Sequence, residues 1–412
     1  MPSQKRKLIF VWNYVEWGGA QIYFIGIMKL ARKDWDVKVI LPRGSDPKLL
    51  GFLGQIDVQY EFLERQYDLG PATSIRRRIE RRFNILLSEI EVFRYLLRYD
   101  LSDSILHIEA SPWQSSMLLA ALAMRRANLF VTMHNALPAA SALREFLWKL
   151  RIGLVSRLPR FHVFASNQDT KNRFRRWVSE AFWQTIRVTY TTVDPPDINR
   201  AIESGVDRLT LRNRFGIDEN AFIVLCVGQF IDRKGRWVFV DAAKIAAKKY
   251  PDIRFVWLTS SAVSETDSKR IEKSGVGENF ALISADGLGT DRQDILAFYR
   301  IADVYVQPSY VEGLPVALLE AMAMRLPSVS TNVYAIPEAI RHDETGLLID
   351  AGDPNQLAEA VIRLWADEAL RKRLAAAGRE FVIAKFDERV ASQIAIDAYK
   401  ECLPDCQSYG DR

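Results

Sequence analysis

The sequence has few of the residues that form disulfides or bind metals. Its 412 residues include three cysteines, Cys226, Cys402 and Cys406, and only four histidines. Three cysteines offer neither a disulfide framework nor the four-ligand spacing of a zinc site. We therefore expect a reducing compartment and no metal centre.

Long apolar runs are also missing. The longest, near residues 117–124, is far shorter than the roughly 20 residues that a transmembrane helix needs. A basic start precedes the apolar stretch Leu8 to Trp12, which is too short for the core of a signal peptide. These features predict a cytoplasmic protein without a membrane span.

The charge is unevenly distributed along the chain. Residues 1–200 hold 30 Lys and Arg against 19 Asp and Glu, a balance of +11, while the remainder holds 26 against 32, a balance of −6; the two sum to the net +5. A basic half favours an anionic partner, either nucleic acid or acidic lipid headgroups. No zinc-finger spacing, basic-region heptad or RNA-binding aromatic motif accompanies the charge, so we expect no nucleic acid partner.

Strands and helices alternate along the chain. Short apolar runs recur between helical stretches from Leu8 to Ile349, which indicates α/β layers. The length suits two domains of about 100–200 residues. Turn-forming residues at 189–197 interrupt the periodicity and predict the linker between them. No Gly-x-Gly-x-x-Gly is present, which argues against a dinucleotide oxidoreductase.

Two glutamates stand out near the end of an apolar strand at 302–308. Glu312 lies in the following loop, and Gly313 allows a close backbone approach to a ligand. Pro315 suits the first position of the next helix. Glu320 lies inside that apolar helix, which has no structural need of a carboxylate. Glu320 is therefore either a ligand-binding group or a solvated or salt-bridged residue.

Three other segments place polar or glycine residues at strand ends. Gly18 and Gly19 precede a helix, where backbone N–H groups can face an anion, although a lone Gly-Gly pair more often forms a tight turn. His134 follows the apolar strand 129–133, at the sheet edge where α/β proteins bind ligands, although lone histidines are often structural. Arg233 and Lys234, next to a strand-to-helix loop, either clamp a phosphate or are solvated surface charges.

The segment from Glu312-Gly313-Leu314-Pro315 to Glu320 resembles the paired-glutamate signature of glycosyltransferase family 4, the retaining group 1 glycosyltransferases with the GT-B fold. That resemblance implies two Rossmann-like domains with parallel sheets facing each other across a cleft. It places Glu312 against the donor sugar, Glu320 on the nucleotide ribose, and Gly313 and Leu314 beside the donor.

The resemblance extends to the other segments. It implies that Gly18-Gly19 lie beside the donor phosphates, that His134 approaches the transferred sugar, and that Lys234-Gly235 hold the diphosphate. Gln229 occupies the position at which the family usually has an arginine, and we expect Arg233 to supply that charge. Thr191-Thr192 replace the family's Asn-Gly, another departure from the pattern.

The function implied is transfer of a sugar from a UDP- or GDP-sugar to a glycan or lipid-linked acceptor, in cell-surface polysaccharide or glycolipid synthesis, without a metal or other cofactor. Residues 1–193 would bind the acceptor and residues 194–386 the donor, with a terminal helix at 387–403 crossing back to the first domain. An epimerase or phosphorylase on the same fold, and a non-catalytic glycan-binding protein, are the alternatives. The Asp34-x-Asp36 motif at the entry of a strand is predicted to be surface.

A basic, amphipathic stretch lies at residues 71–99. Five arginines between Arg76 and Arg82 adjoin apolar residues at helical spacing, a pattern typical of helices that lie in a lipid headgroup layer. The alternative is that the apolar face packs against the first domain. We therefore consider an anionic membrane surface, at the inner face of the membrane, as a further partner of the basic domain.

Overall fold

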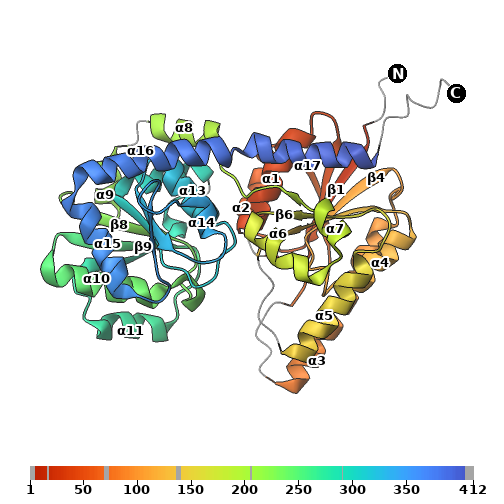
Figure 1. Cartoon of the computed structure of the whole chain (residues 1–412), viewed down its shortest axis with the longest axis horizontal. Coiled ribbons are helices and arrows are strands. Elements are labelled where there is room, and N and C mark those ends of the chain that lie inside the picture. Colours follow the sequence, from red (N-terminus) through yellow and green to blue (C-terminus); the bar gives the residue numbers. More distant parts are fainter. Residues whose placement is uncertain are drawn as a thin grey trace. The chain divides into compact units, whose positions relative to one another are not determined.

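The computed structural model describes residues 5–15, 18–68, 74–135, 141–204, 207–289 and 291–403. The chain forms two compact units (Figure 1). Unit 1 comprises Met1–Tyr190 and Arg389–Arg412, and unit 2 comprises Thr191–Glu388. The sequence-based boundaries, after residues 193 and 386, lie three and two residues from these. Cys406 and part of the loop after Asn135 lie outside the described residues.

Unit 1 is built on a parallel sheet of seven strands. The strand order is β3-β2-β1-β4-β5-β6-β7, and the strands are β1 (Lys7–Val11), β2 (Asp36–Pro42), β3 (Gln59–Leu63), β4 (Ser104–Ile108), β5 (Asn128–Met133), β6 (Phe161–Ala165) and β7 (Arg187–Val188). Alternate residues of β1 enter different cores: Leu8 and Phe10 lie in one, and Ile9 and Val11 in the other. Both faces are therefore covered, as expected of a parallel sheet.

Helices lie on both faces of this sheet. They are α1 (Gly19–Ala31), α2 (Pro47–Gln55), α3 (Ile75–Leu96), α4 (Ser116–Met124), α5 (Ala142–Val155), α6 (Gln168–Phe174), α7 (Glu180–Thr185) and the chain's last described helix, α17 (Glu388–Cys402). The core beside α1 and α2 includes Ala395, Ile396 and Tyr399 of α17. The predicted terminal helix is thus present and packs within unit 1.

Unit 2 contains a second parallel sheet, of six strands. Its order is β10-β9-β8-β11-β12-β13, and the strands are β8 (Phe222–Val227), β9 (Ile253–Thr259), β10 (Phe280–Ser284), β11 (Val304–Gln307), β12 (Ser328–Thr331) and β13 (Leu347–Ile349). The surrounding helices are α8 (Pro195–Glu203), α9 (Arg208–Arg214), α10 (Arg236–Lys249), α11 (Glu265–Ser274), α12 (Arg292–Phe298), α13 (Val316–Ala323), α14 (Ile336–Ala339), α15 (Pro354–Ala366) and α16 (Glu368–Lys385).

The strand order reverses direction once in each sheet. In unit 1 the change falls between β1 and β4, and in unit 2 between β8 and β11. Loops that leave the carboxyl ends of such strands diverge to opposite faces and open a crevice, which is where open α/β sheets bind ligands. The predicted two parallel-sheet α/β units are confirmed.

One local prediction needs correction and another is confirmed. Pro315 has φ −76° and ψ 124°, an extended conformation, so it caps α13 and the first helical residue is Val316. The aspartates of the Asp34-x-Asp36 motif lie at the surface, as predicted, with 57% and 46% of their side chains exposed, while Trp35 between them is buried in the core beside α17. The two aspartates pair with lysines, Asp34 with Lys400 and Asp36 with Lys7, each at 2.9 Å.

Candidate active site

The centre of the candidate site is an ion pair between two loops of unit 2. Lys234 lies at the end of a short 3₁₀ helix, Asp232–Lys234, after β8, and Glu312 lies in the loop after β11. Lys234 Nζ lies 2.6 Å from Glu312 Oε1. Because β8 and β11 are neighbours where the strand order reverses, the fold itself brings these residues together from positions 78 apart in the sequence.

Gly235 allows the two loops to approach. It has a φ of +76°, and a Cβ there would lie 1.9 Å from the carbonyl oxygen of Pro308. The loops are further joined by Tyr310 N–H, which donates to the carbonyl of Arg233 at 2.9 Å. Any side chain at position 235 would therefore push apart the loops that carry Lys234 and Glu312.

Glu312 is buried and held by neutral donors as well as by lysine. Ser309 Oγ donates to Glu312 Oε1 at 2.7 Å, and Gln307 Nε2 donates to the same oxygen at 3.1 Å. Arg233 Nη1 lies 3.7 Å from the other carboxylate oxygen and donates to the Val311 carbonyl at 3.0 Å. Arg233 is thus adjacent to the pair but more exposed, with 43% of its side chain accessible.

Glu320 is also buried, in the middle of α13, and it has its own partners. Arg292 Nη2 lies 2.7 Å from Glu320 Oε1, and Tyr299 OH donates to Oε2 at 3.0 Å. Burial raises the pKa of Tyr299 well above 10.0, and the adjacent Glu320 raises it further. Glu320 is therefore salt-bridged, with partners that the sequence did not suggest, and its contact with a ligand stays a prediction.

Two tyrosines and a glutamine connect the surroundings of the two glutamates. The rings of Tyr299 and Tyr305 lie 6.0 Å apart, and Tyr305 OH donates to Gln307 Oε1 at 2.9 Å. Gln307 in turn donates to Glu312. A buried set of side chains thus runs from Glu320 to Glu312 through the 3₁₀ helix Tyr299–Ile301, β11 and the loop after β11.

The sequence therefore predicted the cluster in part. Lys234, Arg233 and Glu312 lie together, Gly235 lets their loops meet, and Gly313 and Leu314 are buried in the loop after Glu312. Five neighbours were not predicted: Arg292, Tyr299, Tyr305, Gln307 and Ser309. The sequence offered one signal for these neighbours, the polar residues Gln307 and Ser309 at the two ends of the strand-to-loop junction 307–309.

Polar groups also gather at the carboxyl edge of the sheet in unit 1. His134 lies directly after β5, and its Nε2 is 3.3 Å from Glu109 Oε2, which follows β4. The contact lacks hydrogen-bond geometry, and these two atoms are without a hydrogen-bond partner among the described residues. The side chain of Asn13, after β1, is likewise buried without a partner in the part of the chain that the structure describes.

The paired glycines lie at the same edge. Gly18 caps α1 in an extended conformation, and Gly19 is the first residue of the helix. Tyr23, one turn further on, contacts the His134 ring edge-to-face at 5.2 Å between ring centres. Gly18, Gly19 and His134 are thus at the end of the sheet where the sequence predicted them, whereas their ligand contacts remain predictions.

Groups that suit metals are not found in the described ranges. No three or more His, Cys, Asp or Glu side chains of those residues lie close enough together to hold an ion. Cys226 and Cys402 are both free thiols.

Comparison with known families identifies unit 2. Residues 207–381 match the family model of "Glycosyl transferases group 1". This span contains Lys234, Glu312 and Glu320 with the loops around them. The likeness to the group 1 glycosyltransferases is therefore one of unit 2.

Curated relatives of the chain match over similar lengths. A GDP-mannose-dependent α-(1-6)-phosphatidylinositol monomannoside mannosyltransferase of Mycobacterium tuberculosis is 29% identical over 226 residues, 53% of this chain and 56% of the relative. A D-inositol 3-phosphate glycosyltransferase of Acidothermus cellulolyticus is 32% identical over 189 residues, 44% and 42% of the two chains. The chain thus aligns with about half the length of the curated relatives it matches.

Solved structures match over nearly the whole chain. A glycosyltransferase from Rickettsia africae has a TM-score of 0.76 at 18% identity and covers 98% of this chain and 100% of its own. Anabaena HepE, in complex with UDP and glucose, has a TM-score of 0.75 at 19% identity, with 96% and 99% covered. At this identity the likeness shows the fold alone, and the fold is GT-B.

Proposed function

We propose that the chain is a retaining glycosyltransferase that moves a sugar from a UDP- or GDP-sugar to a glycan or lipid-linked acceptor. The observation that carries the proposal is the Lys234–Glu312 pair with Arg233 beside it, at the strand-order reversal of unit 2. A buried carboxylate and two cations can there contact adjacent parts of one activated sugar.

The negative charge of the donor diphosphate would explain why the cations Lys234 and Arg233 lie at this site. Cleavage at the anomeric carbon leaves a new negative charge on the departing phosphate, and preorganised positive groups stabilise that charge in the transition state. In this proposal Lys234 leaves Glu312 for the phosphate when the donor binds, with Arg233 in support, and the transfer needs no metal ion. Glu312 then orients the sugar hydroxyls and stabilises positive charge on the ring.

Glu320 would hold the ribose of the donor. Its two oxygens already accept from Arg292 and Tyr299, so each has a second lone pair to offer to a hydroxyl group. Arg292 and Tyr299 would fix the carboxylate, and Gly313 and Leu314 would line the space beside the sugar.

The acceptor would bind in unit 1. His134, Glu109 and Asn13 have hydrogen-bonding atoms without partners among the described residues, and a sugar or polyol presents hydroxyls that satisfy both donors and acceptors. Gly18 and Gly19 would lie beside the phosphates. A lipid-linked acceptor agrees with the mycobacterial relative, which is a phosphatidylinositol monomannoside mannosyltransferase. The enzyme would then work in the cytoplasm at the inner face of the membrane, in polysaccharide or glycolipid synthesis.

Donor binding tests this function. The wild-type protein is screened by thermal shift against UDP, GDP and their sugar conjugates, and the best ligand is titrated calorimetrically into variants. Lys234→Ala and Glu320→Ala should each weaken binding at least about tenfold, which corresponds to about 1.4 kcal/mol.

Matched controls are available on the surface of unit 2. Lys248→Ala and Glu359→Ala remove the same charges from exposed positions on α10 and α15 and should bind as the wild type does. Wild-type affinity in both site variants would contradict the proposal. Product analysis with a separate acceptor distinguishes transfer from epimerisation or phosphorolysis.

A further inference from the structure

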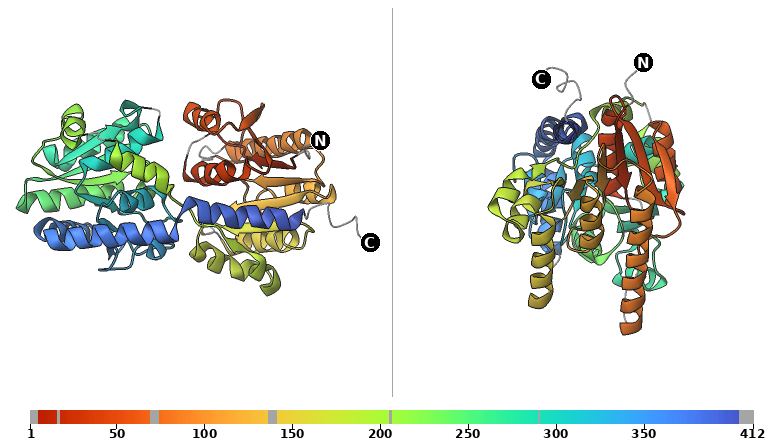
Figure 2. Two further views of the ribbon diagram at one scale, coloured as in Figure 1. Left: turned by 90° about the horizontal axis from the view of Figure 1, so that it is seen from above. Right: turned by 90° about the vertical axis from the view of Figure 1, so that its right-hand side faces the viewer.

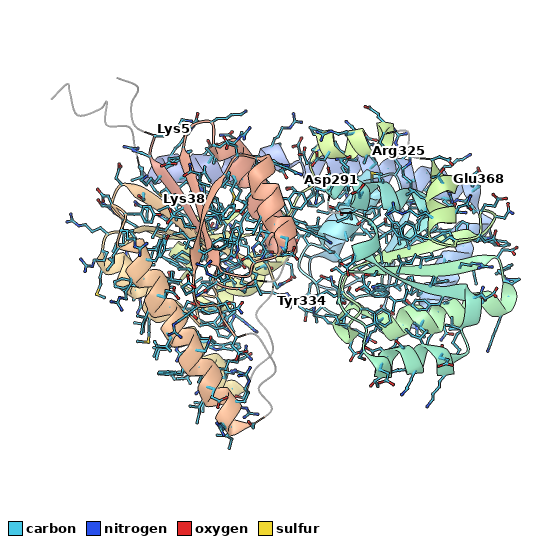
Figure 3. All side chains as sticks on the ribbon, turned by 180° about the vertical axis from the view of Figure 1, so that it is seen from behind. Lys5, Lys38, Asp291, Arg325, Tyr334 and Glu368 are labelled. Atoms are coloured by element: carbon cyan, nitrogen blue, oxygen red, sulfur yellow. The ribbon has the colours of Figure 1, made fainter. Side chains whose placement is uncertain are left out.

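Two helices of unit 1 extend beyond the body of that unit. The N-terminal parts of α3 and α5 project on the same side in Figures 1 and 2. Every residue from Ser74 to Glu80 is exposed, and the first buried residue of α3 is Ser88. Figure 3 shows the side chains of this part of α3 standing away from the rest of unit 1.

The projecting part of α3 carries an exposed apolar stripe. Ile75, Ile79, Phe83, Leu86 and Ile90 are all exposed. At 100° per residue these positions fall within an arc of about 80°. The residues that α3 buries, including Val92 and Leu96, lie on a different side of the helix. The apolar stripe is therefore not the face that packs on unit 1.

The second helix has two apolar faces. Trp148, Ile152 and Val155 are buried against unit 1. Leu143, Phe146, Leu147, Leu150 and Leu154 are exposed, and on a helical projection they fall within an arc of about 100° roughly opposite the buried face. A surface helix needs only one apolar stripe to reach its own core, so the second stripe points to another partner.

Basic residues flank both stripes. On α3, Arg76 lies on one side of the stripe, and Arg78 and Arg82 lie on the other, by their spacing around the helix. On α5, Arg144 lies on one side of the stripe and Lys149 on the other. Together α3 and α5 hold nine Lys and Arg against four Glu. Both helices also present their N-termini, the positive ends of their dipoles, at the projecting end.

We propose that this projection, formed by α3 from Ile75 to Ile90 and α5 from Ala142 to Leu154, docks the protein onto an anionic lipid surface. Apolar stripes flanked by Arg and Lys are the arrangement in which a helix buries side chains at the acyl boundary while its charges contact headgroups. A second copy of the chain fits less well, because pairing two such surfaces would oppose their arginines. The proposal assigns the peripheral membrane association named above to specific residues of α3 and α5. It does not depend on the proposed catalytic function.

Vesicle flotation tests the proposal with the full chain. The wild-type protein should float with phosphatidylcholine vesicles that contain about one third phosphatidylglycerol, and at least about tenfold less with phosphatidylcholine alone, because each basic residue near an anionic surface contributes about 1 kcal/mol. Raising the salt from about 0.1 M to about 1 M shortens the Debye length from about 10 Å to about 3 Å and should weaken the binding.

Paired variants distinguish the contribution of this surface to vesicle binding from that of the rest of the molecule. Phe83→Ser with Phe146→Ser, and Arg82→Gln with Lys149→Gln, should each lower the partition coefficient at least about tenfold. Two control pairs change comparably exposed residues outside the projection: Leu209→Ser with Val390→Ser, and Lys248→Gln with Lys273→Gln. Both control pairs should leave the partition coefficient unchanged. Unaltered thermal midpoints and donor affinity in the variants show that folding and the proposed active site are intact.

Three outcomes would overturn the proposal. They are equal recovery with neutral and anionic vesicles, equal binding of the projection variants and their controls, and a stable dimer in light scattering that the Phe83→Ser with Phe146→Ser pair dissociates. A failure of donor binding, by contrast, bears only on the proposed transferase function.

Discussion

Gly235 is the residue whose backbone determines the geometry of the unit 2 site. Its positive φ and its contact with the Pro308 carbonyl leave no room for a side chain. The same positive φ occurs at Gly275, +71°, where a Cβ would meet nothing within 4 Å. Comparing alanine substitutions at the two glycines therefore separates the energetic cost of a left-handed backbone from the cost of a steric clash with Pro308.

We predict that Gly235→Ala destabilises the protein by more than about 2 kcal/mol, whereas Gly275→Ala costs about 1 kcal/mol, the price of a left-handed conformation for alanine. Urea unfolding of both variants measures the difference. Gly235→Ala should also weaken donor binding, because the loops that carry Lys234 and Glu312 separate. Equal free energies of unfolding in the two variants would mean that the contact with Pro308 relaxes at no cost.

His107 is a second residue with a measurable signature. It is fully buried in β4, where its ring nitrogens lie 2.5 Å from Tyr399 OH and 2.8 Å from Thr132 Oγ1. Burial, with a smaller contribution from His134, lowers the pKa of His107 well below 6.5. In the unfolded chain the same imidazole takes up a proton near pH 6.5, so below that pH the unfolded state binds more protons than the folded state.

Stability should therefore be retained above about pH 6.5 and lost as the pH falls below it, by up to about 1.4 kcal/mol per pH unit from this group. We predict that His107→Asn makes the free energy of unfolding less dependent on pH between about 6.5 and 5. Tyr399→Phe removes the hydrogen bond but keeps the imidazole, so the pH dependence should persist in that variant. An unchanged slope in His107→Asn would contradict the assignment.

At the scale of elements, α17 joins distant parts of the sequence. Its residues Ala395, Ile396 and Tyr399 are buried in the core beside β1, α1 and α2. Lys400 pairs with Asp34 at 2.9 Å, and Arg187 forms an ion pair with Glu401. The helix is therefore part of the first unit despite following the second in the chain.

Truncation after Phe386 should destabilise unit 1 and leave unit 2 folded. It opens the core around Tyr399, and loss of one large buried aromatic side chain alone costs about 3–5 kcal/mol. Hydrogen exchange followed by mass spectrometry should show faster exchange in β1, β2 and β4 and unchanged protection in β8, β9 and β11. Equal loss of protection in both units would contradict this view of α17.

The same scale explains which elements the sequence predicted well. Apolar strands were found within one or two residues, as for β5, predicted at 129–133, and β11, predicted at 302–308, since a strand buried on both faces is a continuous apolar run. The start of α13 was misplaced by one residue because proline fits both the cap and the first turn. The pattern at 71–99 revealed an amphipathic helix but not which side of it would stay exposed.

At the scale of the whole molecule, the uneven charge along the sequence follows the division of the chain into two units. The basic first half of the sequence forms most of unit 1, which carries the α3 and α5 projection, and the more acidic remainder forms most of unit 2. No helix among the described residues combines the length and the apolar character that crossing a bilayer requires. The proposed membrane contact is argued from the exposed apolar stripes and basic residues of the projection.

Periodicity and local spacing were enough to predict the alternation of strands and helices and the positions of Glu312, Lys234 and His134 at strand ends. The two parallel sheets were implied by the resemblance to a known family. The tertiary structure alone decided that Lys234 meets Glu312, that Arg292 and Tyr299 hold Glu320, and that the stripes on α3 and α5 remain uncovered. Strand order determines which loops become neighbours, and packing determines which apolar face is buried. Both depend on contacts between residues far apart in the chain, which no local pattern encodes.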